Sequence, residues 1–108
     1  MLMIQFAQSD SFDADDDSEF RREVEALADT CLRQANEGHC DGGDIGSGKV
    51  NVFCTVGDGQ RACDLVVNAL ESAGIEGAVI AFVDDNEVED VDPRVLWPKD
   101  FAGSFSVL

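Results

Sequence analysis

Hydrophobic residues in this chain switch between a two-residue spacing and a helical spacing, and the order of the switches leaves few possible folds. The two-residue pattern and its bounding turn residues predict strands over residues 1–7 and 49–56, and a glycine-rich turn joins the second of these to a further expected strand over residues 39–44. Residues 78–83 are apolar at every position, which is typical of a strand buried on both faces. Helical spacing predicts one amphipathic helix after the first strand and another after the third. The expected order is therefore β-α-β-β-α-β.

Both predicted helices carry end signals. In the first, Asp16 followed by Glu19 forms a variant of the capping box, and Gly38 is placed to end the helix. In the second, Asp58 is the expected N-cap and Gly74 the expected left-handed residue at the C-terminus. The buried stripes are expected to contain Phe20, Val24, Leu27 and Cys31 in the first helix, and Ala62, Leu65, Val66, Ala69, Leu70 and Ala73 in the second.

This order of elements is that of an α+β, ferredoxin-like βαββαβ domain, in which both helices pack on one face of a four-stranded antiparallel sheet. The length of 108 residues suits a single domain spanning residues 1–108. The second face of the sheet would expose Phe53. Residues 93–108, which include Trp97, are the expected cover, either of their own sheet or of a partner surface.

The net charge restricts the partners. Seven basic residues against 23 acidic ones give −16 at pH 7, which disfavours attachment to nucleic acid and to anionic membranes. The start of the chain lacks a basic segment of the secretory kind, and no apolar run reaches the length of a membrane helix. We therefore expect a cytoplasmic protein that binds neither nucleic acid nor membrane.

Residues 43–49 match the G-x-x-x-x-G-K part of a phosphate-binding loop. The residue that follows is Val50, so the hydroxyl that would bind magnesium is missing, and a strand pattern follows where a helix is required. Asp41 and Asp44 also place negative charge beside the phosphate position. We expect a hairpin turn here and no nucleotide site, although Asp84 follows an apolar strand as a magnesium ligand would.

Two acidic runs stand out along the chain. The run over residues 13–19 contains a D-x-D-x-D pattern, but Ser18 and Val24 occupy the positions where a calcium loop needs Gly and Glu. The second run is either a solvated loop or half of an electrostatic docking surface. Its six acids are Asp84, Asp85, Glu87, Glu89, Asp90 and Asp92.

The cysteines and the single histidine do not form a catalytic pattern. No two cysteines have CxxC spacing, and reduced thiols are the rule in the cytoplasm. His39 and Cys40 are adjacent on a predicted strand, so their side chains should point to opposite faces. The interpretation of Cys31, Cys54 and Cys63 is that they pack as small core residues. The sequence thus predicts no catalytic residue, no cofactor and no metal site.

The hairpin over residues 41–48, followed by Val50, Asn51, Val52 and Phe53, resembles a group of small bacterial proteins. In that group an acidic, glycine-containing hairpin leads into a strand with an aromatic residue, then a helix and a closing strand. The similarity covers residues 38–83. Some of these proteins look like immunity proteins, which neutralise toxins by binding them, so the resemblance implies a binding role without assigning it to particular residues.

We expect an acidic, non-enzymatic domain that binds, and inhibits or regulates, a basic protein. The candidate contact surfaces are the six acids of residues 84–92, the acidic run over residues 13–19, and the open face of the sheet with Phe53 and Trp97. Two alternatives stay open: a small-molecule regulatory domain of the ACT type, and a homodimer that pairs through the open face or an edge strand. An RNA recognition module has the same strand order but needs several aromatic residues where residues 49–56 have only Phe53.

Overall fold

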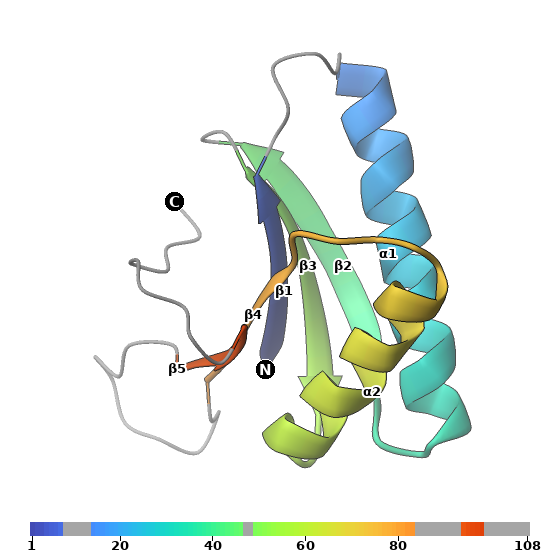
Figure 1. The fold of residues 1–108 in the computed structure, drawn as a ribbon, viewed down its shortest axis with the longest axis vertical. Helices are drawn as coiled ribbons and strands as arrows, with labels where there is room; N and C mark the ends of the chain where they lie inside the picture. Colours follow the sequence, from blue (N-terminus) through green and yellow to red (C-terminus); the bar gives the residue numbers. More distant parts are fainter. Residues whose placement is uncertain (8–13, 47–48, 84–93, 99–108) are drawn as a thin grey trace.

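Two helices and one five-stranded antiparallel sheet make up the α+β fold of this chain (Figure 1). The computed structural model describes residues 1–7, 14–46, 49–83 and 94–98, without the side chains of residues 7, 14–18 and 46. The elements are β1 (Leu2–Ala7), α1 (Ala14–Gln34), β2 (Gly38–Gly46), β3 (Lys49–Val56), α2 (Gly59–Ser72), β4 (Val79–Phe82) and β5 (Arg94–Trp97). The predicted order of the first six elements is confirmed.

The strands lie in the order β2-β3-β1-β4-β5, and every neighbouring pair is antiparallel. The expected number of four strands is wrong, because Arg94–Trp97 pairs with the outer edge of β4. This fifth strand gives backbone partners to an edge that would otherwise leave its N–H and C=O groups unpaired within the sheet. Residues 93–108 were expected to cover the second face of the sheet or a partner surface. Within this segment Arg94–Trp97 extends the sheet as β5, and residues 93 and 99–108 lie outside the described residues.

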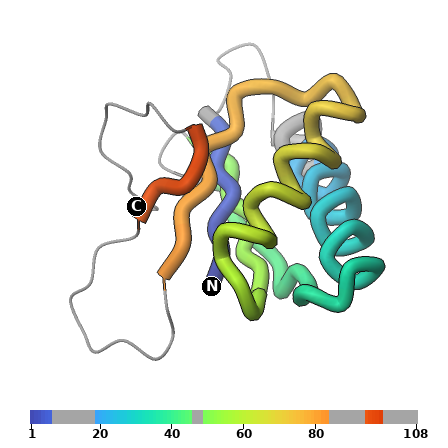
Figure 2. Tube along the Cα trace, turned by 60° about the horizontal axis from the view of Figure 1, so that its bottom comes forward, coloured from blue at the N-terminus to red at the C-terminus, as the bar shows by residue number. Residues whose placement is uncertain are grey.

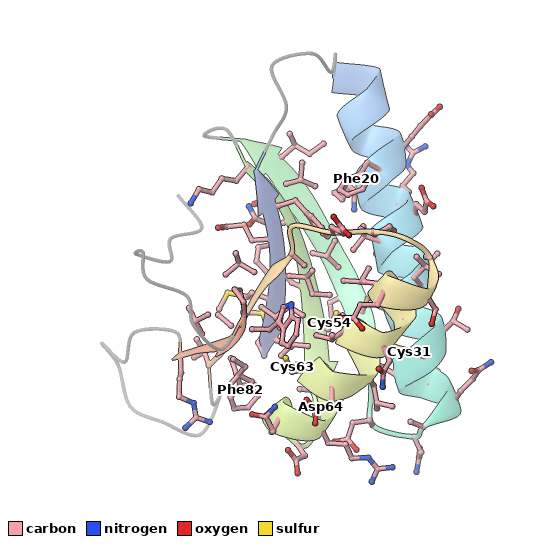
Figure 3. All side chains as sticks on the ribbon, in the orientation of Figure 1. Phe20, Cys31, Cys54, Cys63, Asp64 and Phe82 are labelled. Atoms are coloured by element: carbon pink, nitrogen blue, oxygen red, sulfur yellow. The ribbon has the colours of Figure 1, made fainter. Side chains whose placement is uncertain are left out.

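Both helices pack on the same face of the sheet, side by side (Figures 1 and 2). Alternate residues of each central strand point into this layer, and Phe6 meets Phe20 of α1 edge to face with ring centroids 4.8 Å apart (Figure 3). Leu32 is fully buried although it was not expected in the stripe of α1, whereas Ala73 is exposed beyond the end of α2. The buried members of the core are Leu2, Ile4, Phe6, Val24, Ala28, Leu32, Val50, Val52, Cys54, Ala62, Cys63, Val66, Leu70, Ala78 and Ile80.

The ends of α2 follow the prediction, and those of α1 do not. The Asp58 side chain accepts a hydrogen bond from the backbone N–H of Arg61 at 3.1 Å, and Gly74 has a φ of 75° in the left-handed region. The first helix begins at Ala14, so Asp16 lies inside it. After the helix ends, Asn36 takes a left-handed φ of 54°, which leaves Gly38 free to begin β2. Asparagine tolerates this conformation better than most residues, so it replaces the expected glycine.

The glycine-rich segment is an ordinary antiparallel pairing, as predicted. Between the register pairs Cys40↔Cys54 and Gly42↔Phe53 the extra residue Asp41 forms a bulge, and Gly42 has a φ of 129°. A Cβ at Gly43 would lie 2.1 Å from a backbone oxygen of β3, so no larger residue fits this approach. The glycines therefore serve the bulge and the close pairing of β2 with β3, and the turn residues 47–48 lie outside the described residues.

Candidate functional site

A hollow of about 310 Å³ lies where the C-terminal end of α2 meets β5. It forms because Gly74 reverses the chain after α2 and residues 75–78 run back toward β4, leaving a gap that Trp97 borders from the neighbouring strand. In the register of β4 and β5, Trp97 lies opposite the buried Ile80, which places it on the helix side of the sheet at the margin of the core. The lining residues are Val67, Leu70, Glu71, Gly74, Ile75, Glu76, Gly77, Ala78 and Trp97.

The chemistry of this hollow suits a cationic group with an apolar stem. Its walls are aliphatic, and one side is the half-buried indole of Trp97. Glu71 and Glu76 are exposed, and neither carboxylate has an ion-pair partner in the described part of the chain. An indole face and two carboxylates both attract a cation, and their attraction is stronger where the apolar walls exclude water.

Phe53 and Trp97, which were expected together on the open face of the sheet, lie on opposite faces. Phe53 alternates with the buried Val52 and Cys54 on β3, so it points to the sheet face away from the helices, whereas Trp97 lies on the helix side. The six acids of residues 84–92 lie outside the described residues. Glu71 and Glu76 were not among the candidate residues, because single acidic residues near a helix end have the same sequence pattern as ordinary solvent-exposed residues.

Much of the positive charge in the described residues is already paired within the chain. Arg21 and Arg33 form ion pairs with the acids one turn away on α1, each at 2.9 Å, and Arg61 lies 3.5 Å from Glu37. Exposed pairs of this kind add little stability, but they leave these three of the seven basic side chains locally neutralised. The acids without such a partner, Glu71 and Glu76 among them, therefore set the sign of the surface.

A row of polar side chains crosses the second face of the sheet from β2 to β1. The Nε2 of Gln5 donates to the Oδ1 of Asn51, and the Nδ2 of Asn51 donates to the Oδ1 of Asp44, both at 2.9 Å. Lys49 adds a bond from its Nζ to the Oε1 of Gln5 at 3.2 Å. Gln5 and Asn51 are only 5% and 1% exposed, so these bonds satisfy amides that water does not reach. We name these four residues the amide row.

The residues of the motifs that resemble catalytic sites make contacts with their neighbours in the sheet. Lys49, the lysine of the G-x-x-x-x-G-K match, bonds within the amide row at the start of a strand. The imidazole of His39 lies 2.9 Å from the carboxylate of Asp41, and Thr55 donates to the same carboxylate. Cys40 points the other way, toward Cys54, so the expected separation of His39 from Cys40 is confirmed.

Two general searches of the described residues found nothing. Residues 1–7, 14–46, 49–83 and 94–98 contain no group of three or more His, Cys, Asp or Glu side chains that could hold a metal ion. In the same ranges, neither helix is long and apolar enough to cross a membrane.

Comparison of this chain with family models, with curated proteins and with solved structures gave no match in any of the three.

Proposed function

We propose that this chain is a non-enzymatic interaction domain that binds a basic protein and so inhibits or regulates it. The observation that carries the proposal is the hollow beside Trp97, which combines aliphatic walls, an indole and two carboxylates without ion-pair partners. We also infer that the fold is ferredoxin-like, supported by the order β2-β3-β1-β4 and by two helices on one face, with β5 as an additional strand.

The hollow would receive a lysine or arginine side chain of the partner. The aliphatic stem of such a residue would lie against Val67, Leu70 and Ile75, and its charged head would meet the Trp97 indole. Glu71 and Glu76 at the rim would attract the same charged head. Anchors of this kind, an aromatic residue in a pocket with a charged rim, dominate the binding energy of many interfaces.

The net charge of −16 supports the same partner chemistry. Long-range attraction of a basic partner raises the rate of encounter, and like charge disfavours acidic competitors. The six acids of residues 84–92, which connect β4 to β5 in the sequence, belong to this proposal as a second contribution to the field.

The experiment starts with capture of a partner from lysate of the source cells at low salt, followed by its identification, purification and titration. The Kd should rise steeply between about 0.05 and 0.5 M salt, because screening weakens the attraction. Trp97→Ala should raise the Kd by roughly 30-fold, and the double change Glu71→Gln and Glu76→Gln should raise it by several-fold. Glu23→Gln, an exposed acid on α1 away from the hollow, is the matched control and should leave the Kd unchanged.

A second variant tests the acidic run by itself. Amides at all six positions of residues 84–92 should abolish partner binding while the thermal unfolding transition stays cooperative. Partner binding that survives both this variant and Trp97→Ala contradicts the proposal. Thermal unfolding of Trp97→Ala is measured alongside, because Trp97 also packs against the core.

A small-molecule regulatory domain is the second candidate, and the size of the hollow favours it. About 310 Å³ falls at the lower limit of ordinary ligand pockets, large enough for a small organic amine. Such a domain would show a rise in melting temperature with one metabolite from a panel of amines and amino acids, and little dependence on salt. A homodimer, the other alternative, would appear in sedimentation as a mass twice that of the chain.

A further inference from the structure

The sulfur atoms of Cys40 and Cys54 lie 2.7 Å apart, and no function described above uses them. The two residues are direct partners in the register of β2 and β3. Directly opposed residues of antiparallel strands have Cα separations of about 4.5–5.5 Å, which is inside the range that a disulfide spans. Forming the bond would therefore require only a small approach of two sulfurs that already touch.

The two thiols differ in access, which gives the pair an order of reaction. Cys40 lies on the edge strand and is partly exposed, whereas Cys54 is fully buried in the core. A reagent from solution can therefore reach Cys40 but not Cys54. The hydrogen bond with Cys40, together with burial, raises the pKa of the Cys54 thiol, which agrees with a reaction that begins at the more accessible Cys40.

We propose that Cys40 and Cys54 form a reversible disulfide site, oxidised by small-molecule disulfides of the glutathione type. The Cys40 thiol loses its proton and attacks one sulfur of the reagent, which breaks the reagent's S–S bond and releases one thiolate. Cys54 then gives up its proton and attacks the Cys40 sulfur, which releases the second thiolate. The two protons end on the two released thiols, and two electrons pass from the protein pair to the reagent.

The competing thiol is Cys31 on α1. The Cys31 side chain is partly exposed. Burial is the main cause of its raised pKa, and the nearby Cys40 thiol adds to it. The Cys31 thiol, however, donates to the carbonyl oxygen of Ala28 at 3.2 Å within its own helix. Cys63 lies on α2, where burial and the nearby Asp64 raise its pKa to about 11 (Figure 3). The geometry therefore selects Cys54 as the partner of Cys40.

Oxidation would tie β2 to β3 immediately before the bulge at Asp41. Strand β2 has β3 as its neighbour on one side and is an edge of the sheet on the other. The new bond would close the chain between two positions that are 14 residues apart in the sequence. Closing a loop of this size restricts the unfolded chain, so the oxidised protein should melt at a higher temperature.

The test treats the folded, reduced protein with glutathione disulfide, blocks the remaining thiols with iodoacetamide and maps the peptides by mass spectrometry. The expected product is a cross-link between Cys40 and Cys54, with Cys31 and Cys63 alkylated. Dithiothreitol should remove the cross-link. The melting temperature should rise by roughly 5–10 °C on oxidation, since a closed loop of this size stabilises small domains by that order.

Serine variants separate this pairing from its competitors. Cys31→Ser and Cys63→Ser should keep both the cross-link and the rise in melting temperature, and Cys40→Ser should lose both. Cys40 is partly exposed on an edge strand, so Cys40→Ser should fold. This variant can therefore be measured even if substitution of the buried Cys54 prevents folding. A cross-link from Cys40 to Cys31, a stable mixed disulfide of glutathione on Cys40, or the absence of any cross-link would each overturn the proposal.

Discussion

Neighbouring residues of the central strands are buried on opposite faces of the sheet by different chemistry. On the face under the helices, Ile4 and Val52 are fully buried among apolar side chains. On the opposite face, Gln5 and Asn51 are nearly as inaccessible, and their amides bond to each other. Burial of apolar groups is not directional, whereas a buried amide is stable only where its partners meet it. We therefore expect the helix-covered face to supply most of the stability and the amide row to align the strands.

The amide row aligns three strands because its members are direct register partners. Asp44 lies opposite Asn51 on β2 and β3, and Asn51 lies opposite Gln5 on β3 and β1. A slip of one residue would turn Asn51 toward the helices and break its two hydrogen bonds at once. The row thus penalises wrong registers more than it adds to the stability of the right one.

The largest effect is expected from a cavity on the helix-covered face. Ile4→Ala removes buried methyl groups from the central strand β1, and it should lower the free energy of unfolding by about 3 kcal/mol. Ile4→Val is the matched control and should cost about 1 kcal/mol. Urea unfolding measures both, and a loss below that control value for Ile4→Ala would show that this face is not the main source of stability.

The amide row is tested by removing its central member. Asn51→Ala leaves the amide of Gln5 without one buried partner, and it should lower the free energy of unfolding by about 1–3 kcal/mol. In a double-mutant cycle with Gln5→Ala, the loss of unfolding free energy in the double variant should differ from the sum of the two single losses by roughly 0.5 kcal/mol or more. Strictly additive losses in urea unfolding would mean that the two amides do not depend on each other.

The smallest effect concerns a polar contact on the helix side. The Asp29 carboxylate accepts bonds from the backbone N–H of Cys40 and from Arg33, each at 2.9 Å, and it links α1 to β2. The Cys40 N–H first, and Arg33 second, lower the pKa of Asp29 from its ordinary 3.8. The stability that this carboxylate contributes is therefore complete above pH 3.8 and is lost as the pH falls through the lowered pKa of the folded state.

Asp29→Asn should consequently make the stability less dependent on pH at and below 3.8, with little change of slope near neutral pH. Thermal unfolding over this acidic range measures the slope. If the slope were unchanged in Asp29→Asn, the contact of residue 29 with the Cys40 N–H would be equally stable with a charged and with a neutral carboxyl group.

The order of elements was predictable because each depends on local pattern. Alternation identified β1 and β3, a continuous apolar run identified β4, and the caps Asp58 and Gly74 bounded α2 as expected. The prediction failed where local signals were short or ambiguous. Strand β5 has only four residues next to a proline, and its pairing depends on the exposed edge of β4 rather than on its own pattern.

The candidate sites were less predictable, because they depend on contacts between distant residues. Trp97 and Phe53 are both aromatic residues on strands, but the register of β5 places the first on the helix side and alternation on β3 places the second on the other side. The pairing of Cys40 with Cys54 likewise depends on the register of two strands, which the spacing of cysteines in the sequence does not reveal.

The acidic character of this protein, the periodicities of its elements and most of their bounds follow from the sequence, because charge and local spacing are properties of neighbouring residues. Which side chains meet depends on the fold: the amides of Gln5 and Asn51, the sulfurs of Cys40 and Cys54, and Trp97 with the end of α2. These contacts join residues from different elements, and strand register, which is set by the packing of the whole sheet, brings them together.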